Sequence, residues 1–325
     1  MKALMYTDIG KLEIQEVEAP DDAYVVEVKG CGICGTDLKT FKVGHHFFKP
    51  PTILGHEFVG TLTKVPESSP FAIGNNVVVA PYYECGECQA CKTELPQMCK
   101  KKHFVSSGAF CEYVAIPEDY QDGIIRLPDG IDERIFTLVE PLACVLNGIA
   151  HLHLRAWSNA LVVGGGPMGI LFALYFQDIG IPVTVVEPNT YRRQVIKSWD
   201  IDCIDPKESD PSLYNQVIVC VNKADLIADA VHRIADGGTV LAFSGLKKKD
   251  TFDADAYAIH YREVSVAGCS GFALEHFKSA FSMIEHNPKH YSKLITNYMT
   301  LDDGLSAFNL LSEGKAFKIV LQPKG

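Results

Sequence analysis

Residues 161–176 read LVVGGGPMGILFALYF, and this stretch decides the fold of the second half of the chain. Three apolar residues typical of a buried strand lead into a glycine-rich turn, and an apolar helix follows. Glycines permit a tight turn and let the backbone approach a pyrophosphate, whose negative charge lies at the helix N-terminus. This context predicts a dinucleotide site at Gly164, Gly166, Pro167, Met168 and Gly169.

The strand after this helix, VTVVE, ends at Glu187. A carboxylate at that position can accept hydrogen bonds from both ribose hydroxyls of adenosine, and it repels a 2′-phosphate. Arg192 and Arg193 follow within a few residues, and a basic side chain there could accommodate the 2′-phosphate of NADP or stack on adenine. We expect NAD as the cofactor, with Glu187 and Arg192 beside its adenosine half.

The chain changes its pattern twice. Residues 1–142 alternate short β-rich runs with Gly and Pro, which predicts a mostly antiparallel β domain. Residues 143–287 alternate strands and helices, which predicts a doubly wound parallel sheet. Residues 288–325 are expected to return to the first domain, with a helix over 298–314 and a closing strand over 318–323. The predicted fold class is therefore α/β.

Composition limits the possible partners. The chain has 325 residues, 47% hydrophobic and 22% charged, which suits two globular domains. Its formal charge of −10 disfavours nucleic acid and anionic membranes, because phosphate binding depends on clustered Lys and Arg. The sequence has no apolar run of membrane-spanning length and no apolar stretch behind a basic N-terminus. We expect a cytoplasmic protein without a nucleic acid or membrane partner.

Four of the eleven cysteines lie in one short segment, with Cys85, Cys88 and Cys91 followed by Cys99. Thiols stay reduced in the cytosol, so such close spacing indicates metal binding rather than disulfides. Four thiolates complete the tetrahedral coordination of zinc and leave no open position. We therefore predict a structural zinc site in this segment.

Two further segments contain residue types that bind metals: Cys34 in the motif CGICGTD, and His56 with Glu57 in the motif GHE. Neither spacing alone defines a metal site. Together with the four cysteines, the segment VEPLAC and the glycine turn, in this order along essentially the whole chain, they resemble the zinc-containing medium-chain alcohol dehydrogenase superfamily. The resemblance is closest to its sorbitol and polyol dehydrogenase branch. It implies a GroES-like catalytic domain followed by a Rossmann cofactor domain.

The resemblance also implies a catalytic zinc ion held by Cys34 and His56. Glu57 would be a third protein ligand, and Glu140 would bind the metal or hydrogen-bond the water on it; the two carboxylates can exchange. One thiolate, one imidazole and one carboxylate leave a position for water or a substrate hydroxyl. Asp37 is similar to a carboxylate that orients the ligating histidine. Two zinc ions per subunit are expected, one catalytic and one structural.

The proton route is likewise implied by the resemblance. Thr36 matches the position whose hydroxyl receives the alcohol proton and passes it toward the cofactor ribose. Many relatives have a histidine three residues further on, where this chain has Lys39. His45 and His46 could replace it, line the substrate pocket or simply lie in an exposed loop. The predicted catalytic residues are Thr36, Glu57 and Glu140.

These features predict an enzyme that transfers a hydride between an alcohol and NAD, with zinc as a Lewis acid. Glu140 stands where enzymes acting on simple alcohols usually have a second cysteine, so polyols, cyclitols or aminocyclitols are the expected substrates. Threonine-type amino alcohols and sugar phosphates are alternatives within the class, with Lys39 or Lys49 available for a phosphate. A non-catalytic protein that binds zinc and nucleotide is the alternative outside it. By resemblance, a homodimer or homotetramer is expected.

Overall fold

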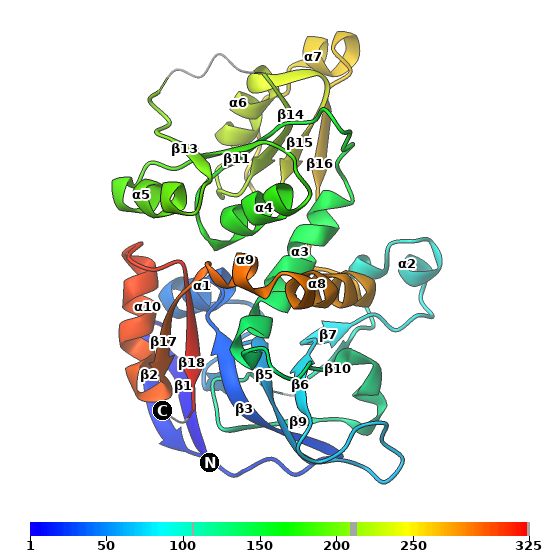
Figure 1. The fold of residues 1–325 in the computed structure, drawn as a ribbon, viewed down its shortest axis with the longest axis vertical. Helices are drawn as coiled ribbons and strands as arrows, with labels where there is room; N and C mark the ends of the chain where they lie inside the picture. Colours follow the sequence, from blue (N-terminus) through cyan, green and yellow to red (C-terminus); the bar gives the residue numbers. More distant parts are fainter. Residues whose placement is uncertain (106, 209–212, 324–325) are drawn as a thin grey trace. The chain divides into compact units, whose positions relative to one another are not determined.

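The computed structural model describes residues 1–105, 107–208 and 213–323. The chain forms two compact units (Figure 1). Met1–Ala143 and Ala273–Gly325 make up the first unit, and Cys144–Phe272 makes up the second. Within the described ranges, no helix is both long enough and apolar enough to cross a membrane.

The first unit is built mainly on antiparallel strands. They are β1 (Lys2–Asp8), β2 (Lys11–Glu16), β3 (Tyr24–Gly32), β4 (Thr52–Ile53), β5 (Glu57–Lys64), β6 (Asn76–Val79), β7 (Tyr82–Tyr83), β8 (His103–Phe104), β9 (Tyr113–Ile116), β10 (Ile124–Arg126), β17 (Ile295–Thr300) and β18 (Lys318–Gln322). The largest sheet has the order β10-β6-β5-β3-β18-β17, with β9 also paired to β3. A second sheet has the order β2-β1-β4, and β7 pairs with β8.

Apolar side chains on these strands form the core of the first unit. Val26 and Val28 of β3 are 0% and 3% exposed, and Leu62 lies opposite Val26 on β5. A Cβ at Gly60 would collide with the carbonyl of Glu27, so glycine permits the close approach where the pairing of β3 and β5 shifts register. One apolar cluster joins residues of β1, β3 and β5.

The helices of the first unit are short. They are α1 (Gly35–Val43), α2 (Gln89–Lys92), α8 (Leu274–His286), α9 (Pro288–Ser292) and α10 (Gly304–Ser312), with 3-10 turns η1 (Pro96–Met98), η2 (Glu118–Gly123), η3 (Glu133–Leu138) and η4 (Leu301–Asp303). Helix α3 (Val139–Ile149) begins in the first unit and ends in the second.

The C-terminal part differs from the prediction in two respects. The change back to the first unit comes at residue 273 rather than 288, because α8 packs against η3 of that unit. The helix predicted over 298–314 is wrong at its start, since residues 298–300 belong to β17. This strand pairs in parallel with β18, and that pairing satisfies the backbone groups that a helix would otherwise satisfy locally. Figure 1 shows β17 and β18 side by side.

The second unit is a doubly wound α/β structure. Its strands are β11 (Ala160–Val163), β12 (Val183–Val186), β13 (Asp202–Ile204), β14 (Tyr214–Val219), β15 (Ile234–Ala242) and β16 (Ser265–Gly268). They form one parallel sheet of order β13-β12-β11-β14-β15-β16, which is the Rossmann order. The helices are α4 (Pro167–Asp178), α5 (Thr190–Ser198), α6 (Asp225–Arg233) and α7 (Ala256–Tyr261). The predicted fold class is confirmed.

Both faces of this parallel sheet are covered, which explains its apolar strands. Leu161 and Val162 of β11 are both 0% exposed. Helix α4 packs on β11 and β12, and α6 packs on β14 and β15. Glycine at position 169 is required here, because a Cβ would collide with the carbonyl of Gly164 where α4 crosses the turn.

Candidate metal and nucleotide sites

Cys34, His56 and Glu57 come together at the ends of two paired strands. Cys34 follows β3 and caps the N-terminus of α1, whereas His56 immediately precedes β5 and Glu57 begins it. Gly32 of β3 lies opposite Glu57, so the strand pairing places the thiol beside the carboxylate. The ligand atoms of the three residues lie within 4.8 Å of one another. A thiol, an imidazole and a carboxylate at this spacing form a donor set that fits zinc.

Asp37 connects the two segments of this cluster. Its side chain is 1% exposed; Oδ2 accepts a hydrogen bond from the Cys34 N–H at 2.9 Å, and Oδ1 accepts one from the Gly55 N–H at 3.3 Å. His56 Nδ1 lies 3.6 Å from Asp37 Oδ1, which leaves the other ring nitrogen for a metal. Burial lowers the pKa of His56, but the negative charges of Asp37 and Cys34 outweigh it and raise that pKa well above its usual value.

Lys318, which sequence reasoning missed, completes the surroundings of Glu57. Its ammonium donates to Glu57 Oε1 at 2.8 Å, to Oε2 at 2.7 Å and to the Ile33 carbonyl at 3.1 Å. The side chains of Lys318 and Glu57 are 2% and 0% exposed. Burial lowers the pKa of Lys318, but the charges of Glu57 and Cys34 outweigh this effect and raise it. The two residues are therefore a fully buried ion pair.

The other predicted catalytic residues lie on α1 and α3. Thr36 is half-buried in the first turn of α1, and its N–H points to Cys34 Sγ at 3.5 Å. Glu140 lies in the first turn of α3 and is 7% exposed. Among the described residues, Glu140 is not part of the group of close ligand atoms, although its charge contributes to the raised pKa of Lys318.

Lys39 lies in the middle of α1, and His45 and His46 follow the C-terminal end of this helix. Lys39 is exposed on the helix, and the rings of His45 and His46 follow it with centroids 4.5 Å apart. Burial lowers the pKa of His45, and the positive charges of His46, Lys39 and Lys49 lower it further.

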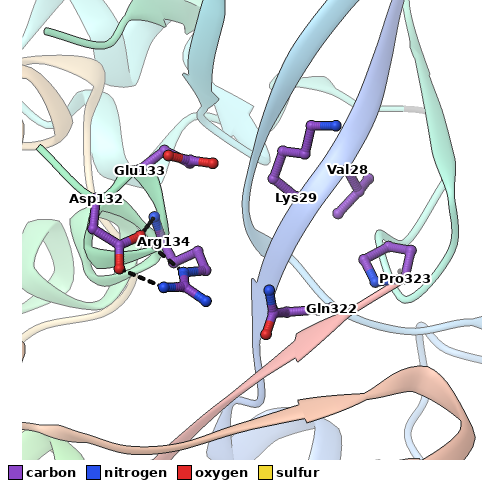
Figure 2. A pocket seen from close by; sticks show the side chains of 7 residues that line it. All are labelled: Val28, Lys29, Asp132, Glu133, Arg134, Gln322 and Pro323. Atoms are coloured by element: carbon purple, nitrogen blue, oxygen red, sulfur yellow. Dashed lines mark hydrogen bonds and ion pairs between the residues drawn. The ribbon is translucent and has the colours of Figure 1, made fainter. Parts of the chain in front are cut away.

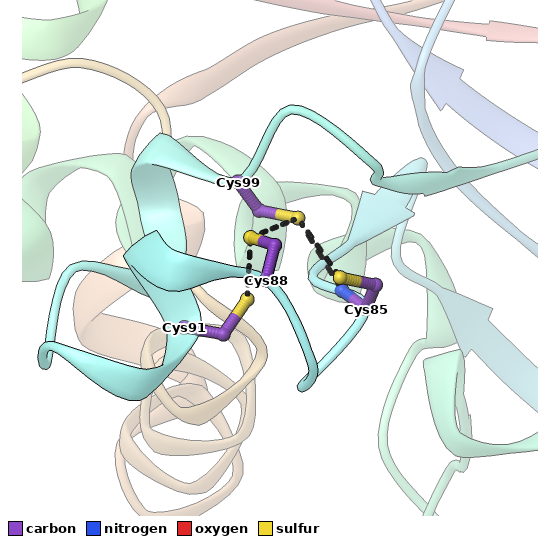
Figure 3. Close-up of side chains that lie close together, drawn as sticks. All are labelled: Cys85, Cys88, Cys91 and Cys99. Atoms are coloured by element: carbon purple, nitrogen blue, oxygen red, sulfur yellow. Dashed lines mark hydrogen bonds between the residues drawn. The ribbon is translucent and has the colours of Figure 1, made fainter.

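The four cysteines form a second cluster (Figure 3). Their sulfur atoms turn toward one another: Cys88 lies 3.5 Å from Cys91 and 3.7 Å from Cys99, and Cys99 lies 3.5 Å from Cys85. Four sulfurs around one zinc ion lie about 3.8 Å apart when each bond is about 2.3 Å. A hydrogen bond from the Cys91 backbone is the largest cause that lowers the pKa of Cys88, to about 6. The donor set and the spacing both fit zinc.

The glycine turn of the second unit has the geometry that a pyrophosphate needs. Gly164 has a φ of 106°, a conformation that favours glycine, and Gly166 caps the N-terminus of α4. No side chain of the described residues caps α4, Pro167 occupies its first turn, and the space where a Cβ of Gly166 would lie is open. The free N–H groups of the first turn, in which Met168 also lies, are therefore available to an anion.

Glu187 lies beside this turn and is 5% exposed. Its Oε2 accepts a hydrogen bond from the Gly165 N–H at 3.0 Å, and its Oε1 accepts one from the Asn189 N–H at 2.8 Å. These bonds fix the carboxylate, and each oxygen retains a second lone pair for a ribose hydroxyl. The guanidinium of Arg193 is held by Asp205 at 2.9 Å and by the Glu187 carbonyl at 2.8 Å. The N–H of Arg192 donates to Asn189 Oδ1 at 3.0 Å in the first turn of α5.

A surface pocket of about 400 Å³ lies elsewhere in the first unit (Figure 2). It is lined by Val28, Lys29, Asp132, Glu133, Arg134, Gln322 and Pro323. Gln322 is four positions along β18 from Lys318, about 13 Å in an extended strand. Arg134 is paired with Asp132 at 2.7 Å, as Figure 2 shows, and Lys29 is paired with Glu27 at 2.7 Å. None of the predicted site residues lines this pocket.

Comparison with known proteins agrees with this picture. Residues 20–129 match the alcohol dehydrogenase GroES-like domain. Sorbitol dehydrogenase of Halalkalibacterium halodurans is 27% identical, over 99% of each chain. D-altritol 5-dehydrogenase of Agrobacterium fabrum is 27% identical over 95% of each chain.

A solved structure shares the fold. The 2R,3R-butanediol dehydrogenase of Bacillus subtilis superimposes with a TM-score of 0.88 over 99% of each chain, at 24% identity. The motifs, the two-unit fold and the curated relatives all indicate similarity to alcohol and polyol dehydrogenases. Residues 20–129 thus carry the GroES-like domain of alcohol dehydrogenases, and over nearly its whole length the chain is similar to sorbitol and other polyol dehydrogenases.

Proposed function

We propose that this protein is a zinc-dependent dehydrogenase that transfers a hydride between a secondary alcohol and NAD. The observation that carries the proposal is the convergence of the ligand atoms of Cys34, His56 and Glu57 within 4.8 Å, and the glycine turn at the uncapped N-terminus of α4 supports it. Polyols, cyclitols or aminocyclitols are the proposed substrates. The names of the curated relatives, which include sorbitol and D-altritol dehydrogenases, support this class.

In this proposal Cys34 and His56 hold the catalytic zinc, together with a carboxylate from Glu57 or Glu140. Bound zinc supplies Lewis-acid chemistry toward a substrate hydroxyl, and the nicotinamide supplies the hydride acceptor. The Asp37 carboxylate lies 3.6 Å from His56 Nδ1 and orients this ring. The same carboxylate accepts a hydrogen bond from the Cys34 backbone N–H. Thr36, half-buried in the first turn of α1 two residues after Cys34, would accept the substrate proton at its hydroxyl oxygen and pass its own hydroxyl proton toward the cofactor ribose.

The four-cysteine cluster holds a second, structural zinc ion, so that each subunit binds two. Sulfur distances of 3.5–3.7 Å between neighbouring cysteines support this assignment. The cluster has four protein ligands and therefore no position for a substrate. Its contribution is to the folding of its loop rather than to the reaction.

The second unit binds the cofactor. The uncapped N-terminus of α4 takes the pyrophosphate, and Glu187 takes the adenosine ribose hydroxyls, with Arg192 nearby. The buried carboxylate of Glu187 repels a 2′-phosphate, which supports NAD over NADP. The guanidinium of Arg193 is already held by Asp205, so it is a poor candidate for a phosphate.

The test is NADH formation across sorbitol, other polyols, inositols, aminocyclitols, threonine and sugar phosphates, with zinc content measured on the same sample. We expect turnover with at least one polyol or cyclitol, and slower turnover with NADP. Turnover restricted to threonine or to a sugar phosphate would replace polyols and cyclitols by that compound class as the substrate. A fully zinc-loaded protein that turns over none of these would refute the proposed function and favour a binding protein.

A further inference from the structure

The segment that follows Cys34 is basic, although the whole chain has a formal charge of −10. Residues 35–51 form α1 and the loop behind it, and their titratable side chains are Lys39, Lys42, Lys49, His45, His46 and Asp37. Asp37 is the only acidic residue among them, and its 1% exposed carboxylate accepts hydrogen bonds from backbone N–H groups. The three lysines are exposed. Positive charge therefore prevails on the surface of this segment.

Lys39 and Thr36 lie on the same side of α1. Residues three positions apart on a helix have Cβ atoms about 5–6 Å from each other, and neither of these two belongs to the buried side of the helix. The backbone nitrogen of Thr36 lies 3.5 Å from the sulfur of Cys34, so this end of α1 adjoins the candidate metal ligands. The long, flexible side chain of Lys39 can therefore reach a molecule whose hydroxyl lies beside Thr36.

The loop behind α1 brings a second lysine toward the first. The ring centroid of His45 lies 4.5 Å from that of His46 and 5.2 Å from that of Phe48, so the three rings form one group. Burial lowers the pKa of His45, and the positive charges of His46, Lys39 and Lys49 lower it further. Lys39 of the helix and Lys49 of the loop therefore both lie near the His45 ring.

Both lysines carry charge that the protein does not neutralise. Within the part of the chain that the structure describes, neither Lys39 nor Lys49 is in an ion pair, whereas Lys29 is paired with Glu27 at 2.7 Å. An ammonium is a compact charge with three donors, and it binds most strongly to carboxylates and phosphates. Unneutralised positive charge also attracts anions from solution and repels cations. This side of α1 therefore suits a substrate that carries an anion.

We propose that the substrate is an anionic polyol, an aldonate or a polyol phosphate, whose charged group is bound by Lys39 and Lys49 while the reacting hydroxyl lies beside Thr36. The proposal rests on the proposed function and narrows its substrate class. The carbinol hydrogen still leaves as a hydride to NAD and the hydroxyl proton still leaves to Thr36, so the anionic group takes no part in the reaction. Neutral polyols then bind more weakly, and protonated aminocyclitols bind more weakly still.

The test compares substrates of one configuration that differ in charge, with the zinc-loaded protein and saturating NAD. Sorbitol, D-gluconate and sorbitol 6-phosphate form one such set, and the galacto and manno series give two more. In at least one series, kcat/KM for an anionic member is expected to exceed that of the neutral alditol on the order of 10-fold. This preference should shrink when sodium chloride is raised from about 0.05 to 0.5 M, because salt screens exposed charges. The preferred anion, carboxylate or phosphate, identifies the substrate, and either supports the proposal.

Single substitutions assign the preference to the lysines. Lys39→Met should raise KM for the anionic substrate on the order of 10-fold and lower the ratio of anionic to neutral kcat/KM by the same factor. Lys49→Met should act in the same direction, and Lys39→Arg should retain most of the preference because it keeps the charge. Lys42→Met is the matched control, since Lys42 is exposed on the same helix but lies six residues, about 9 Å, beyond Thr36. It should leave the ratio unchanged.

The results that overturn this inference differ from the result that overturns the proposed function. Neutral polyols turned over as well as their anionic counterparts in every series would refute the inference and leave the dehydrogenase standing. An anionic preference that survives in both Lys39→Met and Lys49→Met, or an equal loss for neutral and anionic substrates in Lys39→Met, would also refute it. A zinc-loaded protein that oxidises no member of any series, charged or neutral, would count against the proposed function itself.

Discussion

The chain builds its two metal clusters in different ways. The four cysteines come from one segment in which the first and last ligands are 14 positions apart, and all donors are sulfur. The Cys34 cluster joins the ends of β3 and β5, mixes three donor types and lies against a lysine from the last strand. Four thiolates would fill the coordination of a zinc ion and leave no position for a substrate. The three donors of the Cys34 cluster would leave one position open to a substrate hydroxyl.

The largest expected effect is a loss of activity when the Cys34 cluster is changed. Cys34→Ser should lower kcat/KM on the order of 1,000-fold or more, because it removes a ligand of the Lewis acid. NAD binding, measured by calorimetry, should persist, since the dinucleotide turn lies in the other unit. A Cys34→Ser protein with wild-type kcat/KM would show that this cluster has no part in the reaction.

The next effect concerns stability. Cys88→Ser should lower the free energy of unfolding by about 3 kcal/mol, comparable to opening a cross-linked loop of about 15 residues. Denaturant titration with and without a zinc chelator measures it, and the chelator should have little further effect on the variant. Cys269→Ser, outside both clusters, is the control. Equal stability of Cys88→Ser and wild type would contradict a structural role.

Lys318→Met should also destabilise the protein, by about 3–5 kcal/mol, because it leaves the Glu57 carboxylate buried without its partner. Adding Glu57→Gln should recover a large part of this loss. Lys29→Met should cost at most about 1 kcal/mol, since its pair is half-exposed. Urea denaturation of the four proteins gives the comparison, and additive losses in the double variant would argue against the pair.

The smallest expected effect tests a contact between the four-cysteine segment and α8. Glu84 immediately precedes Cys85 in the sequence. Its Oε2 accepts a hydrogen bond from the Leu274 backbone N–H at 3.0 Å. Glu84→Gln should lower the free energy of unfolding by about 1 kcal/mol and leave NADH formation unchanged. Glu87→Gln, exposed in the same segment, is the control. A shift no larger than that of the control would mean that the contact contributes nothing to stability.

The features of this structure that depend on short segments could be predicted from the sequence. The spacing of Cys85, Cys88, Cys91 and Cys99 predicts a metal loop by itself, and the glycine turn predicts its strand and helix, because both signals lie within one short segment. Cys34 and His56 are predicted to be ligands of one metal ion only because their motifs resemble a known family, since their spacing alone does not define a metal site. The structure places these two residues side by side, and their roles stay predictions.

The parts that could not be predicted depend on long-range pairing. Lys318 begins a closing strand that continues with three apolar residues, and nothing local indicates that its ammonium meets a carboxylate 261 positions away. For the same reason, the local sequence of residues 298–300 favours a helix, whereas these residues form a strand because β18 lies beside them. The second change of unit depends likewise on the packing of α8 against η3.

The most direct test of the division between the two clusters is the zinc content per chain of wild type, Cys34→Ser and Cys88→Ser, measured by mass spectrometry after extensive dialysis. We expect two zinc ions in the wild type and one in each variant, with NADH formation surviving in Cys88→Ser at temperatures where it remains folded. One zinc ion in the wild type, or two in Cys34→Ser, would contradict the assignment of one structural and one catalytic site.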